Sequence, residues 1–215
     1  MSSNLQLYNS SHKHLDALAV CHAHCFPASL SSKLGIAYIK KTLEWFLVDD
    51  NRFLFHSEID GNIIGYCGGF IPRGFGDGSS SGMLQFAFKE AVIGIIKNPF
   101  LIFNKEVREF YPFIFRNIKN KIFGKPKIKV VDSSNQPRKK FTGLVVIGVL
   151  PAFRGTEVFP SLMNYFEEQS KIRNVLLLNL SVKKNNDRAI AAYKKFGWYV
   201  TEEHAKSFVM QKSLS

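Results

Sequence analysis

The chain has 215 residues, 46% of them hydrophobic, and a formal net charge of +12 at pH 7. This length and hydrophobic content can build one full hydrophobic core, so we expect a single domain over residues 1–215 rather than two. Its three cysteines are an odd number without a paired framework, which argues against a disulfide-stabilised secreted protein and predicts a reduced, cytoplasmic setting.

Membrane-spanning, secreted and metal-binding proteins are also disfavoured. No apolar run reaches the roughly 18 residues of a membrane-spanning helix, and the polar N-terminus does not have the pattern of a signal peptide. Two histidines, His22 and His24, lie beside Cys21 and Cys25. On a helix the two cysteines share a face that the histidines do not complete, so we expect no metal site.

The first seventy residues predict a strand, two helices and a hairpin. Residues 5–8 form a weak strand pattern, and residues 14–26 and 32–48 have the apolar spacing of two helices. Residues 52–59 and 62–71 are strand-like runs joined by an Asp-Gly turn, which is typical of a hairpin. The second run contains three glycines that predict close approach by another backbone or a ligand: Gly65, Gly68 and Gly69.

Residues 74–141 form a long, basic and aromatic segment. A Gly/Ser-rich loop over 73–82 precedes two helix-like stretches, 83–96 and 100–123, which are interrupted by prolines. Between residues 83 and 141 thirteen Lys or Arg stand against four Asp or Glu. Most of the net positive charge of the chain is therefore local to this segment.

Three interpretations of this segment are open. It can be an inserted helical subdomain that packs on the core, or an amphipathic element that makes peripheral contact with an anionic membrane surface. It can also bind nucleic acid, but basicity alone supplies only nonspecific attraction and the sequence contains no nucleic-acid motif. We expect the packed subdomain, with membrane contact as the alternative and no specific nucleic-acid partner.

The stretch after this segment predicts alternating strands and helices. Residues 144–150 are a short β-branched run, which is typical of a central strand. A helix over 158–172, a strand over 175–182 and a helix over 186–196 follow. Such units place a helix N-terminus, with its free N–H groups, at the exit of a strand, which is a suitable place to hold a phosphate.

The C-terminal tail predicts two more strands, at 199–202 and 207–212. Val209 and Met210 would form the buried centre of the last strand. These strands would complete a mixed sheet that begins with the N-terminal hairpin.

Two motifs in this part of the chain resemble a known family. Residues 149–155, VLPAFRG, are similar to the V-x-P-x-x-R-G segment of the GNAT superfamily of acyl-CoA N-acyltransferases. The family's later N-x-x-A-x-x-x-Y-x-x-x-G-F pattern is matched, with Trp in place of Phe, by Asn186, Ala189, Tyr193, Gly197 and Trp198. Because both motifs occur in the right order about thirty residues apart, the resemblance is more specific than either motif alone.

The resemblance implies the GNAT fold, which is an α/β (α+β) architecture with a mixed central sheet of about six to seven strands flanked by helices. The basic segment would then be a helical insertion, at about 74–141, before the central strand. A shorter match, Phe26-Pro27 followed by Leu34-Gly35, resembles a GNAT subgroup tied to bacterial sugar and surface-polysaccharide pathways.

The resemblance also implies acetyl-CoA as co-substrate. In the family, the strand before the arginine splays from its neighbour and pairs with the pantetheine arm, and the following loop wraps the diphosphate with N–H groups. The corresponding residues here are Ile147, Gly148, Val149, Arg154, Gly155, Thr156, Glu157, Val158 and Phe159, with Asn186 at the pantetheine arm. Tyr193 would be the catalytic proton donor to the departing thiolate, because its ordinary pKa of roughly 10 suits that step.

The loop departs from the family pattern, which usually continues R-G-x-G-x-G or R-G-x-G-x-A. Here Glu157 and Phe159 replace the later small residues and add negative charge and bulk, although the backbone N–H groups remain. We therefore expect an acetyl-CoA-dependent N-acetyltransferase that acts on a primary amine, plausibly of an amino sugar, by direct attack on the thioester. The alternative is a non-catalytic GNAT-like module that binds CoA, a lipid surface or a protein partner.

In the family the region of the first two helices forms one wall of the acceptor pocket. Three polar residues there are candidates for contact with the acceptor: His22, His24 and Asp49.

Overall fold

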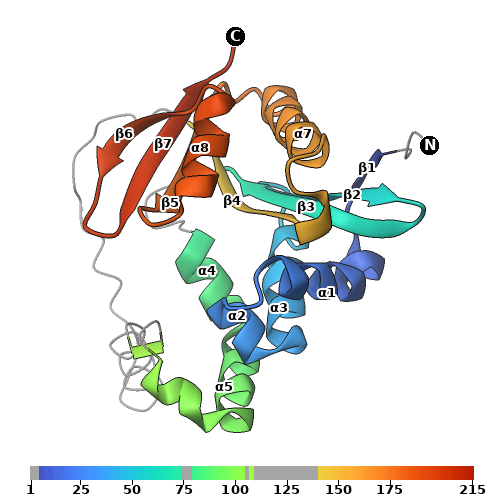
Figure 1. The fold of residues 1–215 in the computed structure, drawn as a ribbon, viewed down its shortest axis with the longest axis vertical. Helices are drawn as coiled ribbons and strands as arrows, with labels where there is room; N and C mark the ends of the chain where they lie inside the picture. Colours follow the sequence, from blue (N-terminus) through green and yellow to red (C-terminus); the bar gives the residue numbers. More distant parts are fainter. Residues whose placement is uncertain (1–4, 74–78, 105–106, 109–139) are drawn as a thin grey trace.

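In a computed structural model, which describes residues 5–73, 79–104, 107–108 and 140–215, seven strands form one mixed sheet (Figure 1). Their order across the sheet is β1-β2-β3-β4-β5-β7-β6. Neighbouring strands are antiparallel except for β4 and β5, which are parallel. The strands are β1 (Gln6–Asn9), β2 (Arg52–Ile59), β3 (Asn62–Phe70), β4 (Thr142–Val149), β5 (Leu177–Lys183), β6 (Tyr199–Glu203) and β7 (Ser207–Ser213).

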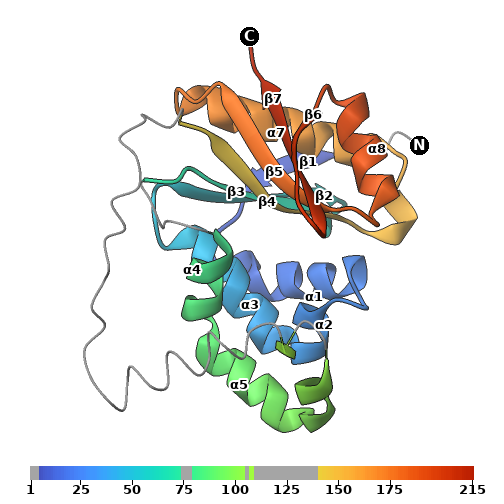
Figure 2. The ribbon, with the colours of Figure 1, turned by 90° about the vertical axis from the view of Figure 1, so that its left-hand side faces the viewer.

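Helices cover both faces of this sheet (Figure 2). One layer contains α7 (Val158–Ile172) and α8 (Asp187–Lys195). The opposite layer contains α1 (Leu15–Cys25), α2 (Leu30–Leu34), α3 (Ile36–Glu44), α4 (Ser79–Phe86) and α5 (Phe88–Lys97). Short 3₁₀ helices are η1 (His12–His14), η2 (Trp45–Leu47), η3 (Pro99–Phe103) and η4 (Pro151–Phe153).

The sheet separates two hydrophobic cores because successive side chains of a strand point to opposite faces. On β3, Cys67 belongs to the core under α7 and α8, whereas its neighbour Tyr66 belongs to the core that α1 and α3 cover. Both side chains are fully buried. Because both faces of the sheet are buried, both need a layer of helices. The fold class predicted from the sequence, a mixed sheet with flanking helices, is therefore confirmed.

Several predicted elements differ in detail from the structure. The helix predicted over 32–48 is wrong, because Gly35, with φ of +102°, separates α2 from α3, and a 3₁₀ turn follows α3. The stretch 83–96 is likewise two helices, α4 and α5, which meet at Ala87. Met210 is buried at the centre of β7, but Val209 is only half-buried.

Two further predictions concern the basic segment and the glycines of β3. In the stretch 100–123 the structure describes η3 and residues 107–108, and the rest lies outside the described residues, as does most of the segment 74–141. The close approach predicted at the β3 glycines is made at Gly65 by the Gly148 backbone and the Ser57 and Val158 side chains, and at Gly68 and Gly69 by aromatic rings. A Cβ at Gly68 would lie 2.8 Å from the Phe46 ring, and one at Gly69 would lie 2.5 Å from the Phe53 ring.

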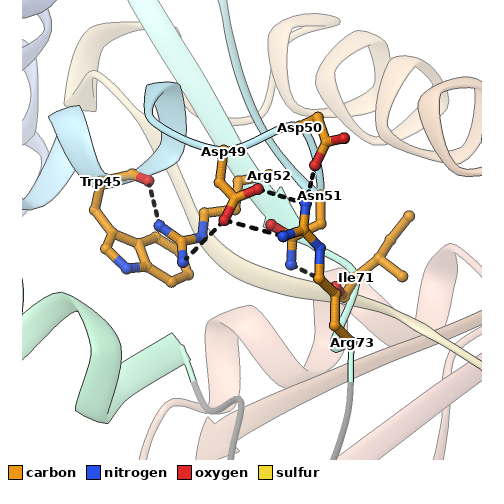
Figure 3. Close-up of polar contacts among 7 residues, drawn as sticks. All are labelled: Trp45, Asp49, Asp50, Asn51, Arg52, Ile71 and Arg73. Atoms are coloured by element: carbon orange, nitrogen blue, oxygen red, sulfur yellow. Dashed lines mark hydrogen bonds and ion pairs between the residues drawn. The ribbon is translucent and has the colours of Figure 1, made fainter.

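A polar cluster closes the sheet where β3 ends (Figure 3). Arg73 makes ion pairs with Asp49, at 2.5 Å, and with Asp50. Asp49 also lies 3.8 Å from the guanidinium of Arg52, which donates a hydrogen bond to the Trp45 carbonyl. Since Phe70 of β3 pairs with Gly143, this cluster lies beside the beginning of β4. It therefore fixes the chain at the end of the sheet opposite to the arginine loop.

Candidate active site

The feature that builds the site is an early end to the pairing between β4 and β5. The two parallel strands are in register from Thr142 opposite Leu178 to Leu144 opposite Leu180, and no further pairs follow. On its other edge β4 remains paired with β3 as far as Val149. One edge of β4 is therefore open over 145–149, and its main-chain groups can pair with an extended ligand.

Main-chain direction identifies which residues face this opening. The N–H of Leu150 donates to Ile64, on the β3 side. Because the main-chain groups of a strand alternate between its two edges, those of Ile147 and Val149 point toward the opening. Gly148 points its main-chain groups toward β3 and not toward the opening, so glycine is required at this position for another reason. A Cβ there would lie 2.7 Å from the Tyr66 ring, which makes Gly148 a requirement of packing.

The side chain of Arg154 holds the loop after β4 in place. Its Nε donates to the Val149 carbonyl at 3.1 Å, and one terminal nitrogen donates to the Cys25 carbonyl at 2.8 Å. Arg154 thus ties the end of β4 to the last residue of α1. The guanidinium binds main-chain oxygens, so its contribution to a diphosphate site is to position the loop.

The loop presents a series of N–H groups at the start of α7. Gly155 has φ of +83°, which permits the sharp turn there. Thr156 donates its hydroxyl to the Phe153 carbonyl and accepts a long bond of 3.4 Å from the Val158 N–H. Within the described chain, the N–H groups of residues 155–157 and 159 have no hydrogen-bond partner. Together with the positive end of the helix dipole, these donors suit a diphosphate.

The two unusual loop residues do not fill the space in front of these donors. Phe159 packs toward α8, with its ring centroid 6.1 Å from that of Tyr193 and 5.6 Å from that of Phe196. Glu157 is exposed at the N-terminal end of α7, where a negative side chain stabilises the helix dipole. The added bulk is thus absorbed by packing, and the added charge remains in solvent.

Asn186 is the N-cap of α8. Its side-chain oxygen accepts a hydrogen bond from the Ala189 N–H at 3.3 Å, which satisfies one of the free donors of the helix. Its amide nitrogen is left as the group that can donate to a ligand. Asn186 therefore has a structural function in addition to any contact with a pantetheine arm.

Tyr193 lies in the core beneath the opening. Its side chain is only 8% exposed and its ring packs against Phe159 and Trp198. Burial, with a smaller effect of Cys67, raises the pKa of Tyr193, so the phenol stays protonated at neutral pH. Cys67 is opposite Ile147 in the β3–β4 register, which places Tyr193 near the open part of β4. Its hydroxyl has no hydrogen-bond partner among the described residues.

On the other face of β4, a buried tyrosine is linked to α1 and α2. The Tyr66 hydroxyl lies 2.5 Å from Nδ1 of His22, and Nε2 of His22 lies 2.8 Å from the Ser31 hydroxyl. Burial lowers the pKa of His22 to about 4, so the ring is neutral at pH 7. These three residues form one hydrogen-bonded chain beside Gly148.

The neighbouring serines set the direction of every bond in this chain. Ser29 donates to Ser32 at 3.1 Å, and Ser32 donates to the Phe26 carbonyl. The proton of Ser29 is thus in use, so Ser31 donates to Ser29, and the bond between His22 and Ser31 is donated by Nε2–H of His22. Nδ1 then accepts from Tyr66. His22 is therefore a neutral Nε2–H tautomer, and this tautomer is assigned from the hydrogen-bonding pattern.

The three acceptor-side candidates are not brought together. His22 lies beside the end of β4, whereas His24 is exposed on α1. Asp49 is in the cluster of Figure 3, at the other end of β4, a distance of about 20 Å along a strand of this length. Tyr66 and Ser31 were missed by the sequence interpretation. A tyrosine among the β3 glycines was the available signal, because so large a residue there must extend into one of the two cores.

Two absences concern the described residues only. Within them, no group of three or more His, Cys, Asp or Glu side chains is arranged to hold a metal ion. No helix in the described ranges has the length and hydropathy to cross a membrane.

Comparisons with known proteins report on the family and the fold. The model of the acetyltransferase (GNAT) family matches residues 92–198. No curated protein matches the sequence.

Solved structures share the fold at low sequence identity. A PaiA N-acetyltransferase from Thermoplasma acidophilum, in complex with coenzyme A, is 13% identical, with 98% of this chain and 99% of that chain covered and a TM-score of 0.58. The ribosomal-protein-S18-alanine N-acetyltransferase from Escherichia coli is 11% identical, with 98% and 94% covered and a TM-score of 0.56. An aminoglycoside N-acetyltransferase in complex with CoA is 14% identical, with 95% and 93% covered and a TM-score of 0.59.

Proposed function

The chain belongs to the acetyltransferase (GNAT) family, and from this premise we propose that it transfers an acetyl group from acetyl-CoA to a primary amine of an amino sugar or a similar small molecule. The observation that carries the proposal is the open edge of β4, followed at once by a loop of unused N–H groups. The open edge suits the pantetheine arm and the loop suits the diphosphate.

Each residue of the site has a defined part in this proposal. Acetyl-CoA supplies an activated acetyl thioester. The main-chain groups of Ile147 and Val149 align it, and the Val149 N–H polarises its carbonyl when the amine attacks directly. Tyr193 then donates its proton to the departing thiolate, and the proton that the amine nitrogen loses restores the phenol, directly or through water. Burial raises the pKa of Tyr193 above the ordinary value on which the sequence prediction relied, so the phenol is fully protonated at neutral pH but is a weaker acid than an exposed tyrosine.

The substrates for which proteins of similar fold are named support the proposal that the acceptor is an amine. Two of the solved neighbours are named for amine substrates, an aminoglycoside and the alanine of a ribosomal protein. For this chain, the polar wall formed by His22 and Ser31 suits a hydroxylated amine better than an apolar one. We place the reaction in the cytoplasm.

A second candidate function is a non-catalytic module that keeps the fold without turnover. The departure at Glu157 and Phe159 favours it. The packing of Phe159 on α8 and the hydroxyl of Tyr193, which is not hydrogen-bonded within the described part, favour the enzyme instead. Turnover separates the two functions, because a non-catalytic module can still bind CoA.

Calorimetric titration with acetyl-CoA tests the cofactor site. We expect micromolar binding that weakens at least tenfold in Arg154→Ala, because the loop loses both of its anchoring bonds. The matched control is Arg173→Ala, since Arg173 also binds a main-chain carbonyl but lies at the opposite end of α7. Absence of binding to the folded wild-type protein would contradict the proposal and favour the non-catalytic module.

Turnover of amino sugars tests the chemistry. In Tyr193→Phe we expect kcat to fall by about 10²-fold, the low end of general acid catalysis, with little change in acetyl-CoA affinity. Tyr165→Phe is the control, because that hydroxyl donates to Asn9 on the β1 side of the molecule. An unchanged rate in Tyr193→Phe would remove Tyr193 from the mechanism.

A further inference from the structure

The outer face of α5 and η3 is apolar where a surface helix is usually polar. Ile96 is 72% exposed, and Phe100 and Phe103 are 81% and 80% exposed. Val92 and Ile93, one turn earlier, are each more than a third exposed. Val92, Ile93 and Ile96 lie along one side of α5, and Phe100 and Phe103, which are three residues apart, lie along one side of η3. We call this set the α5 outer face: Val92, Ile93, Ile96, Phe100 and Phe103.

The opposite side of α5 is fixed by tight packing, so the orientation of the helix is determined. Ala91 and Gly94 are buried against α2. A Cβ at Gly94 would lie 2.5 Å from the Leu34 carbonyl oxygen, which leaves room for glycine alone. Ala91 and Gly94 thus face inward together with the half-buried Ile95, whereas Val92, Ile93 and Ile96 face solvent. Exposed apolar patches of this kind in a folded protein mark interaction sites.

Positive charge surrounds the α5 outer face. Lys89 and Lys97 are exposed on α5, and Arg108 is exposed shortly after η3. The acid of this helix, Glu90, is half-buried. The sequence from 83 to 141 has the excess of thirteen basic over four acidic residues noted above. Apolar residues bordered by basic ones complement a surface with anionic headgroups above hydrocarbon.

We propose that the α5 outer face docks on an anionic lipid bilayer. The phenylalanines and isoleucines enter the boundary between headgroups and acyl chains, and the lysines stay at the level of the headgroup phosphates. In Figure 2, α5 lies at the end of the molecule farthest from the sheet, so it reaches a surface without obstruction by the described sheet or its helices. This inference goes beyond the proposed function and does not depend on it.

Charge argues against a second copy of the chain as the occupant. In a two-fold symmetric dimer the same patch faces itself. Lys89 and Lys97 would then be brought near their counterparts in a low-dielectric interface, where like charges repel. Anionic lipid headgroups remove that repulsion.

Vesicle co-sedimentation tests the proposal with the full-length protein. We expect binding to vesicles of phosphatidylglycerol and phosphatidylcholine and at least tenfold weaker binding to phosphatidylcholine alone. The double variant Phe100→Ser/Phe103→Ser should lose at least tenfold of the binding to anionic vesicles. The matched control is Ile172→Ser/Leu176→Ser, which replaces two residues of similar exposure, 63% and 54%, beyond the α5 layer. Circular dichroism checks that each variant is folded.

Three outcomes would overturn the proposal. The first is that the folded wild-type protein binds neither kind of vesicle. The second is that Phe100→Ser/Phe103→Ser binds anionic vesicles as well as wild type, which would mean that charge outside this face drives the attraction. The third is that sedimentation velocity shows a wild-type dimer that the double variant abolishes, which would assign the face to self-association. Acetyl-CoA binding, measured in parallel, reports on the proposed function separately.

Discussion

Two helices of the same amphipathic pattern bury opposite kinds of residue. α7 buries large apolar side chains such as Leu162, Met163 and Phe166, and its polar residues face solvent. α5 buries Ala91 and Gly94, whereas its Ile93 and Ile96, and Phe100 and Phe103 of η3, face solvent. Helical periodicity therefore predicts a two-sided helix but does not tell which side the fold covers.

What each helix packs against explains the difference. α7 lies over the sheet, where Phe166 meets the Phe53 ring at a centroid distance of 5.7 Å above the glycines of β3. Such a surface requires bulk to fill the layer. α5 approaches the backbone of Leu34 directly, and this contact accepts only small residues. Val92, Ile93 and Ile96 are therefore left on the other side of α5.

The largest expected effect is on the α7 side of the comparison. Phe166→Ala should lower the free energy of unfolding by about 3–5 kcal/mol, because a fully buried ring is lost and a cavity remains. Urea denaturation measures it. Phe100→Ala, at an exposed ring of the α5 outer face, should change stability by less than about 0.5 kcal/mol. Equal losses in the two variants would mean that Phe100 is covered by another part of the chain.

The next effect concerns two histidines of α1 in different environments. Burial lowers the pKa of His22 to about 4 in the folded protein, below the ordinary value of about 6.5 that it has when unfolded. As the pH falls, the unfolded chain therefore takes up a proton on His22 before the folded protein does. The free energy of unfolding is unaffected by protonation of His22 above pH 6.5 and decreases as the pH falls toward 4. By linkage this loss amounts to at most about 3 kcal/mol.

Urea denaturation at pH 7 and pH 4 isolates this effect. His22→Gln should lose less stability on acidification than wild type does, whereas the exposed His24→Gln should resemble wild type. The difference between variants is needed because burial also lowers the pKa of His56, which acts in the same direction. Identical acid sensitivity in His22→Gln and wild type would show that His22 does not contribute.

The smallest expected effect tests the inner side of α5. In an exposed helix, Gly→Ala usually stabilises by up to about 1 kcal/mol. Gly94→Ala should instead destabilise by about 1–3 kcal/mol, because its Cβ would overlap the Leu34 carbonyl. Val92→Ala on the outer side is the control and should be nearly neutral. A gain of stability in Gly94→Ala would show that α5 is free to move away from α2.

The sequence predicted the elements of the sheet well because strand alternation and helix periodicity are local signals. The hairpin of β2 and β3 has the predicted boundaries to within one residue, and α7 spans the apolar residues that predicted it, from Val158 to Ile172. The break at Gly35 was missed because the apolar spacing continues across it while the backbone does not. Exposure of the α5 outer face could not be predicted, since it depends on a contact with Leu34 some sixty residues away.

The site was predictable only where a motif named it. The pattern around Arg154 located the loop. It did not predict that the Arg154 side chain binds the Cys25 carbonyl, which is 129 residues away in sequence. The assignments of Tyr193 and Asn186 stay predictions. The Tyr66–His22–Ser31 chain links three elements, and no local pattern reports such a network.

The pairing of β3 with β4 joins strands that are about seventy residues apart in the chain. Treated as a flexible loop, a connection of this length exceeds a four-residue turn by about four doublings, each of which costs about 0.6 kcal/mol in closure entropy. The whole excess is therefore about 2.5 kcal/mol, less than the loss of one buried phenylalanine ring. So long a segment can thus grow, shrink or change its sequence between these two strands while the sheet keeps its register.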